Sequence, residues 1–170
     1  KLNLIMKSKI LISCLLICSV NISIYTQIYS PADSLALLSI DANCDLSNQL
    51  NWNTQSNPGS WVGVTWNENS PKRVDQINVG SKMLSNTLDA TPLSAITQIW
   101  CNSNSLSGLS VTGLTNLKRM VFRNNKITGI DLTSCSSLEE IYCGNNGLEL
   151  MDISTVHTLK YLECEDNKLD

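Results

Sequence analysis

The residue types most often used in catalysis are few and scattered in this chain of 170 residues. The only histidine, His157, falls in a connection between two predicted strands, where a solvated loop residue is the simplest interpretation. Glu139 and Glu140 are consecutive, so on a strand their carboxylates point to opposite faces and do not form an acid–base pair. Serines are plentiful, but none has a recognisable histidine and acid partner, and no glycine-rich phosphate loop is present. The sequence therefore predicts a non-catalytic protein that carries no cofactor.

Thiol chemistry is the other possibility, because the chain has seven cysteines. Cys14 and Cys18 lie in an N-terminal apolar run that we expect to be removed, and the cysteines that remain are odd in number. The alternatives are a disulfide framework, buried free thiols or a zinc site. The choice among these three alternatives depends on which secondary-structure elements position the remaining cysteines.

Those elements follow from a sequence repeat of twenty-one residues between Leu93 and Asp170. Three full units and one shortened unit align without a gap, at 93–113, 114–134, 135–155 and 156–170. Each unit begins with apolar residues in alternation, the period of a strand with one buried face. A single unit cannot bury that face alone, so neighbouring units should stack in parallel around a continuous core. The inward columns are Ile96, Leu117, Leu138, Leu159; Ile99, Met120, Ile141, Leu162; Cys101, Phe122, Cys143, Cys164; and, at the turn, Leu106, Ile127, Leu148, Leu169.

An asparagine recurs three residues after the last inward strand position, at Asn104, Asn125, Asn146 and Asn167. Its side-chain amide both donates and accepts hydrogen bonds, so it can pair with backbone groups that leave the strand ladder at the turn. We expect the stacked copies to form a hydrogen-bonded asparagine ladder along the array.

This pattern resembles the leucine-rich repeats, since L-x-x-L-x-L-x-x-N-x-L is matched by LKRMVFRNNKI and LEEIYCGNNGL. The twenty-one-residue period and the cysteines in the inward column are similar to short, bacterial-type repeats. The resemblance implies an α/β solenoid with a parallel β-sheet on the concave face. It also implies short irregular or 3-10 segments on the convex face and a small helical N-terminal cap.

The repeat register bears on Cys143 and Cys164, which share one inward column of adjacent units. Their Cα atoms should lie about 4.8 Å apart with parallel Cβ directions, whereas a disulfide needs converging Cβ atoms about 3.5–4.5 Å apart. Phe122 separates Cys101 from this pair, and no histidine lies in the column, which disfavours zinc. We therefore expect buried free thiols and no metal.

Residues 1–30 are predicted to form a secretory signal peptide. Two lysines follow Met6, and the apolar run from Ile10 to Val20 is too short for a membrane span of about 20 residues. An uncleaved anchor and lipid attachment at Cys14 are the alternatives. This segment predicts a secreted or cell-surface protein, which meets a membrane only through an anchor at its N-terminus or outside this chain.

Residues 31–72 are interpreted as an N-terminal cap. Asp33 or Ser34 can begin a helix that carries Leu35, Leu38 and Ile40 inward.

The same segment resembles the cap of plant-type leucine-rich-repeat receptors, on the residues Ala36-Leu37-Leu38, Trp52, Trp61, Gly63-Val64 and Arg73-Val74. The cysteine pair that bridges such caps is missing here. Packing by Trp52, Trp61 and Trp66 is expected to hold the cap instead.

A degenerate first repeat, residues 73–92, follows the cap, with Val74, Ile77, Val79 and Leu84 in the inward columns. The regular repeats fill residues 93–170, and the last unit is truncated three residues after its asparagine. We expect the native protein to continue into more repeats or another domain.

Strand alternation places a second set of residues on the outward, concave surface. The candidate binding residues there are Trp100, Arg119, Val121, Arg123, Glu140, Tyr142, Tyr161 and Glu163. Exposed Trp and Tyr are residue types enriched at interface hot spots. The charged residues run from basic in the second unit to acidic in the third and fourth, which indicates a partner with a matching dipole.

The net charge is −3 and no basic cluster is present, which argues against nucleic acid as a partner. Together with the resemblance, these features predict a protein-binding module of a secreted or cell-surface protein. One alternative is the recognition ectodomain of a larger receptor-type enzyme, such as a kinase whose catalytic domain lies beyond residue 170. Another is a purely structural role.

Overall fold

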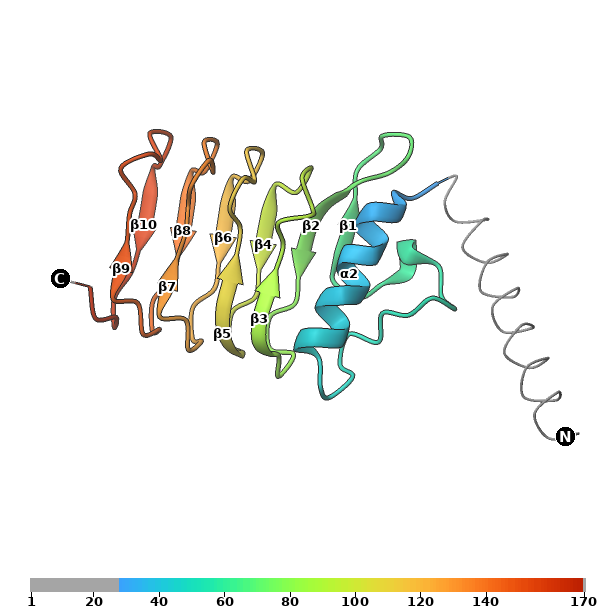
Figure 1. Ribbon diagram of the computed structural model, residues 1–170, viewed down its shortest axis with the longest axis horizontal. Helices are drawn as coiled ribbons and strands as arrows, with labels where there is room; N and C mark the ends of the chain where they lie inside the picture. Colours follow the sequence, from blue (N-terminus) through green and yellow to red (C-terminus); the bar gives the residue numbers. More distant parts are fainter. Residues whose placement is uncertain (1–27, 170) are drawn as a thin grey trace, which may run out of the picture.

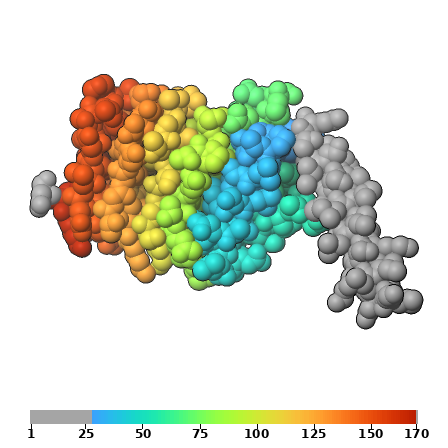
Figure 2. Space-filling model, in the orientation of Figure 1, coloured from blue at the N-terminus to red at the C-terminus, as the bar shows by residue number. Residues whose placement is uncertain are grey.

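The computed structural model describes residues 28–169, so most of the predicted signal peptide lies outside the described residues. The chain forms an array of stacked strands with a helical cap at its N-terminal end (Figure 1). Successive repeats lie as adjacent bands along the array (Figure 2), each packed on the one before it.

The cap helix α2 (Pro31–Cys44) begins earlier than its sequence predicted. Its N-cap is Ser30, not Asp33 or Ser34, because the Ser30 hydroxyl accepts a hydrogen bond from the Asp33 backbone N–H at 3.3 Å. Pro31 takes the first helical position, where a missing N–H costs nothing.

The inward face of α2 also differs from the prediction. Leu37, Ile40 and Cys44 are buried, at the three- and four-residue spacing of one helix face. The predicted inward residue Leu35 is 66% exposed, because residues two apart lie on nearly opposite sides of a helix. Since Leu37 holds the core position, Leu35 must face outward, and the prediction for Leu35 was wrong.

Asp33 ties the cap helix to the first repeat. Its carboxylate is fully buried and accepts hydrogen bonds from Arg73 Nε at 2.9 Å and from the Val74 backbone N–H at 2.8 Å. A buried carboxylate is tolerated only when such partners replace its hydration.

The remainder of the cap is packed by aromatic rings. Trp52 and Trp61 stack with centroids 6.1 Å apart, while Trp66 packs edge-on against Tyr29 at 4.8 Å. The 3-10 helix η1 (Pro58–Ser60) lies in this region, and strand β1 (Val64–Trp66) leads from it into the main sheet.

The predicted parallel sheet is confirmed. It contains β1, β2 (Val74–Asn78), β4 (Gln98–Trp100), β6 (Arg119–Val121), β8 (Glu140–Tyr142) and β10 (Tyr161–Glu163), in that order. β1 is antiparallel to β2, and all later pairs are parallel. Register aligns one inward column from Ile77 through Ile99, Met120 and Ile141 to Leu162. The first four are fully buried and Leu162 is 36% exposed, since β10 is the last strand of the sheet.

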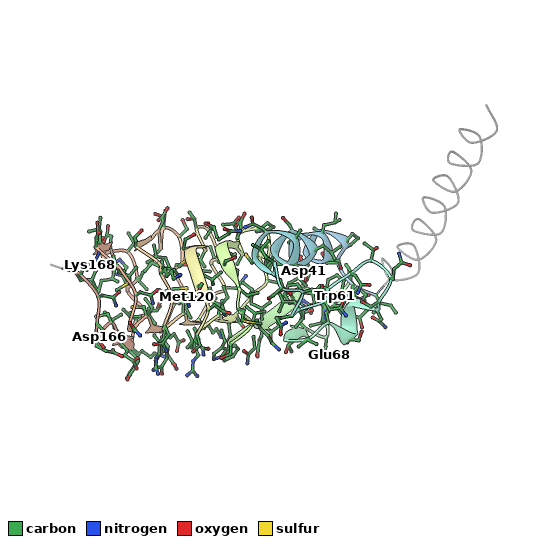
Figure 3. The ribbon with its side chains drawn as sticks, turned by 90° about the horizontal axis from the view of Figure 1, so that it is seen from below. Asp41, Trp61, Glu68, Met120, Asp166 and Lys168 are labelled. Carbon is green, nitrogen blue, oxygen red and sulfur yellow. The ribbon has the colours of Figure 1, made fainter. Side chains whose placement is uncertain are left out.

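The segment of each repeat that runs back after the turn, in the layer opposite the main sheet, is called its return arm. These return arms are more regular than predicted. β3 (Ser85–Asp89) pairs in parallel with β5 (Ser105–Ser110), and β7 (Gly129–Ile130) pairs with β9 (Leu150–Met151). Repeats of similar length bring equivalent return arms within hydrogen-bonding distance, so short strands form where irregular or 3-10 segments were expected. Helix α2 lies beside β3. Asn43 Nδ2 of the helix donates a hydrogen bond to Thr87 O of β3 at 2.7 Å. Met120 lies between the two strand layers (Figure 3).

The recurring asparagines bridge adjacent repeats. Asn125 Nδ2 donates to Phe122 O in its own repeat, at 2.9 Å, and to Cys101 O in the preceding repeat, at 3.0 Å. Asn125 Oδ1 accepts from the Leu106 backbone N–H at 3.0 Å. The same three kinds of bond recur at Asn104 and Asn146, and Asn167 repeats them at the last turn.

The five cysteines of the described residues are free thiols. Cys143 is buried, whereas Cys164 is only partly buried because it follows the last strand. Burial raises the pKa of Cys143 to about 12. Cys164 therefore departs from the expectation that both thiols of this column are inaccessible.

Candidate protein-binding face

The outward surface of the six-stranded sheet is the predicted concave face, called the strand face below. Register places Trp100, Val121, Tyr142 and Glu163 in one column across four strands. A second column contains Gln98, Arg119, Glu140 and Tyr161. Arg123 follows the end of β6 on the same surface. The strands thus gather all eight candidate binding residues on one face, although they come from four separate repeats.

Two arginines and three aromatic rings on this face contact one another. The Arg119 guanidinium lies 5.9 Å from the ring centroid of Trp100 and 5.0 Å from that of Tyr142. The Arg123 guanidinium lies 4.9 Å from the same Tyr142 ring, whose other neighbour is Tyr161 at 4.8 Å between centroids. These five residues are called the aromatic–arginine cluster. Cation–π contacts of this kind restrict the rotamers of side chains that would otherwise be mobile.

Carboxylates from the next strands neutralise both arginines. Arg119 Nε lies 3.3 Å from Glu140 Oε2, and Arg123 Nη2 pairs with Glu163 Oε2. The Tyr142 hydroxyl also donates to Glu140 Oε2, at 3.0 Å. Each arginine of the second regular repeat is therefore paired with a carboxylate of a later repeat, Glu140 one repeat further on and Glu163 two repeats further on. The order of the charges, basic in the second repeat and acidic in the third and fourth, is the one expected from sequence, and the ion pairs join the two groups. A partner with a matching dipole stays a prediction.

The electrostatics of the face reflect its partial loss of hydration. Desolvation, with a hydrogen bond from Glu165, raises the pKa of Glu163, and the Arg123 charge opposes this shift. Desolvation and the Glu140 carboxylate likewise raise the pKa of Tyr142. The Nε atoms of Arg119 and Arg123 are shielded from solvent without an aligned hydrogen-bond acceptor in the described residues.

The structure extends the strand face beyond the residues selected from sequence. β1 and β2 add Thr65, Gln76 and Asn78 at its cap end, and Asn78 pairs in register with Trp100. Gln76 and Asn78 flank the buried Ile77, so the same alternation rule predicts them once the degenerate first repeat is counted as a strand.

The other residues considered for chemistry lie apart from this face. His157 is exposed in the connection before β10. Glu139 pairs with Lys160 at 2.7 Å, away from the Glu140 carboxylate that contacts Arg119. Among residues 28–169 no three His, Cys, Asp or Glu side chains are grouped as a metal site would require.

The family model named Leucine Rich repeats (2 copies) matches residues 115–156, the second and third regular repeats. No curated protein matches the chain by sequence. With this match and the stacked parallel strands, the repeats of this chain are leucine-rich repeats.

Solved structures share the whole fold. The BIR2 ectodomain from Arabidopsis thaliana is similar at 23% identity and a TM-score of 0.68, over 81% of each chain. A chain of the BIR3–SERK2 complex, also from Arabidopsis thaliana, is similar at 23% identity and a TM-score of 0.67, over 81% of this chain and 82% of that chain. A plant ice-binding protein is similar at 21% identity and a TM-score of 0.72, over 84% of this chain and 50% of that chain. The fold is thus that of plant leucine-rich-repeat ectodomains, and this fold serves more than one task.

Proposed function

We propose that this chain is a non-catalytic recognition module whose strand face binds another protein. The observation that carries the proposal is the aromatic–arginine cluster: Trp, Tyr and Arg are the residue types that dominate interface hot spots. Here they lie together on a rigid sheet and restrain one another through ring and guanidinium contacts. Side chains that are already ordered lose less conformational entropy when a partner binds.

The internal ion pairs define what such a partner must offer. Because Glu140 and Glu163 already neutralise Arg119 and Arg123, the cluster does not require a strongly charged partner. Desolvation of a paired charge costs less than that of an isolated one, so a surface with apolar groups and hydrogen-bond acceptors suits this cluster.

Structural neighbours support this use of the fold. One of them was solved in a complex, BIR3 with SERK2, and another is the PEPR1–AtPEP1 structure, similar at 19% identity and a TM-score of 0.52. The neighbours named as ectodomains also support a secreted or cell-surface location for this chain. Within residues 28–169 no helix is both long and apolar enough to cross a membrane.

A capture experiment tests the proposal. Immobilised chain would be crosslinked to proteins of the source organism's extracellular fluid, and the captured proteins identified by mass spectrometry. The partner is then purified and its affinity measured for wild type, Trp100→Ala and Arg119→Ala. Each change should weaken binding by about thirtyfold, as expected for a hot-spot loss of about 2 kcal/mol.

Leu150→Ala is the matched control, because Leu150 is 74% exposed on β9 in the opposite layer. Equal affinity of all four proteins for the partner would show that the strand face is not the interface. A purely structural role would produce no partner whose affinity depends on the cluster.

The alternative function is the recognition ectodomain of a larger receptor-type enzyme. It is favoured by the similarity to the ectodomain of the receptor kinase SOBIR1, at 19% identity and a TM-score of 0.53. The transcript sequence beyond codon 170 decides between them: a membrane span followed by a kinase-like domain supports the alternative, and a stop after further repeats supports a self-contained module.

A further inference from the structure

A hollow of about 330 Å³ lies at the cap end of the strand face, next to the aromatic–arginine cluster. It is lined by Gly63 before β1, Val64 and Thr65 of β1, Gln76 and Asn78 of β2, and Trp100 of β4. Its volume is at the lower end of the roughly 300–1,000 Å³ found for small-ligand pockets.

Backbone geometry shapes one end of this hollow. Gly63 has φ +75°, and a Cβ atom there would lie 2.1 Å from the Asn78 carbonyl oxygen. Only glycine permits this approach, which brings the segment before β1 onto the end of β2. The Asn78 backbone N–H donates to Gly63 O at 2.7 Å and holds the two together. The Asn78 side chain is therefore presented from a fixed position.

Trp100 belongs to the aromatic–arginine cluster and also lines the hollow. β4 lies between β2 and β6, so Trp100 has Asn78 as its register partner on one side and Arg119 near its ring on the other. The contact with Arg119 restrains the indole from the β6 side. The side toward β2 borders the hollow.

The indole N–H of Trp100 differs from those of the other three tryptophans. Trp52 Nε1 donates to Val62 O at 3.0 Å, Trp61 Nε1 to Ser56 Oγ at 2.8 Å, and Trp66 Nε1 to Pro58 O at 3.0 Å. No acceptor for Trp100 Nε1 is found within residues 28–169. Trp100 Nε1 is not among the buried polar atoms, so this N–H is open to solvent and can donate to an acceptor from outside the chain.

The other side chains of the hollow are neutral and retain unused hydrogen-bonding capacity. Amide and hydroxyl groups both donate and accept, and Gln76, Asn78 and Thr65 supply two amides and one hydroxyl. Gln76 Nε2 donates to Asp75 at 3.3 Å and Asn78 Oδ1 accepts from the Gly80 N–H at 3.4 Å, which leaves Gln76 Oε1 and Asn78 Nδ2 for a ligand. None of the lining residues carries a charge.

We propose that this hollow binds one neutral sugar unit of a saccharide, with its ring packed on Trp100. A pyranose ring has an apolar C–H face that suits an aromatic surface, and a rim of hydroxyls that each donate and accept. The amides of Gln76 and Asn78 and the Trp100 N–H match that rim. A charged ligand would lose hydration without a countercharge, and an apolar ligand would leave the amides unpaired. This site does not depend on the proposed protein-binding function.

The test uses the full chain and a panel of neutral hexasaccharides built from glucose, xylose, mannose or N-acetylglucosamine, with polygalacturonic acid as the charged comparison. Each probe is titrated up to about 10 mM by calorimetry and by tryptophan fluorescence. At least one neutral probe should bind, and Trp100→Ala and Asn78→Ala should each weaken it by at least about tenfold, or about 1.4 kcal/mol. Trp100→Phe, which keeps a ring and loses the N–H, should give an intermediate affinity.

Asn116→Ala is the matched control for Asn78→Ala. Asn116 is an exposed asparagine outside the hollow, with one hydrogen bond to Ser94 O at 3.0 Å, and its removal should leave saccharide affinity unchanged. Thermal melts verify that each variant is folded. Three results would overturn the proposal: no neutral probe bound, binding that survives both Trp100→Phe and Asn78→Ala, or tighter binding of polygalacturonic acid. Loss of partner-protein affinity in Asn78→Ala without any saccharide binding would assign the hollow to a protein segment instead.

Discussion

Removal of two adjacent members of the asparagine ladder should cost more free energy of unfolding than the two single changes added together. Phe122 O accepts from Asn125 Nδ2 at 2.9 Å and from Asn146 Nδ2 at 3.0 Å. No backbone N–H of the described residues outside the strands donates to this oxygen. Either asparagine alone keeps the buried carbonyl paired, and only the double change strips it of both partners.

The magnitudes follow from the groups left unpaired. Asn125→Ala removes the acceptor of the Leu106 N–H, which lies at 3.0 Å, and an unpaired buried N–H costs about 1–3 kcal/mol. Asn146→Ala removes the acceptor of the Ile127 N–H, at 3.1 Å, with a similar cost. The double variant should lose about 1 kcal/mol more than the sum, because Phe122 O is then also unpaired.

A non-adjacent pair is the matched control for this coupling. Asn104 Nδ2 donates to Val79 O and Cys101 O, so it shares no acceptor with Asn146. Asn104→Ala and Asn146→Ala should therefore add to within about 0.5 kcal/mol. Asn116→Ala, at an exposed site, should change the free energy of unfolding by less than about 0.5 kcal/mol.

Urea unfolding followed by circular dichroism and tryptophan fluorescence measures these differences, provided the dependence on urea concentration stays the same among the variants. Single changes that cost less than a few tenths of a kcal/mol would refute the ladder. Equal coupling in the adjacent and non-adjacent pairs would refute the shared-acceptor reasoning even if each asparagine is stabilising.

Two further predictions concern the cap and the thiols. Asp33→Asn should lower the free energy of unfolding by about 3 kcal/mol, because the Arg73 guanidinium loses its buried charged partner. The control Glu68→Gln, at an exposed ion pair, should change the free energy of unfolding by less than about 1 kcal/mol. Equal effects of the two changes would contradict a structural role for Asp33. In native protein at pH 8, a thiol reagent should label Cys164 much faster than Cys143, because the buried Cys143 has a pKa of about 12 and stays protonated at pH 8. Peptide mapping by mass spectrometry gives the labelling rate of each cysteine. Equal rates would contradict the burial of Cys143.

Elements that repeat in the sequence were predictable because period and alternation are local properties. The twenty-one-residue register predicted which residues face inward, and Ile99, Met120 and Ile141 are fully buried as expected. The same rule predicted that Trp100, Val121 and Tyr142 share a column, and the strand pairing aligns them. Outside the repeats this information is absent, and the orientation of Leu35 in the cap helix was wrong for that reason.

Contacts between residues far apart in the sequence were decided by tertiary structure alone. Asp33 and Arg73 are 40 residues apart, and so are Arg123 and Glu163, and no local pattern indicates either pair. The charge pairing that neutralises the strand face and the hollow beside Trp100 depend on side-chain directions in adjacent strands. The sequence by itself therefore determined the stacked strands and the set of outward residues, because both depend on residue spacing. Only the packed structure decided which of those residues meet, because that depends on how neighbouring repeats and the cap are placed against one another.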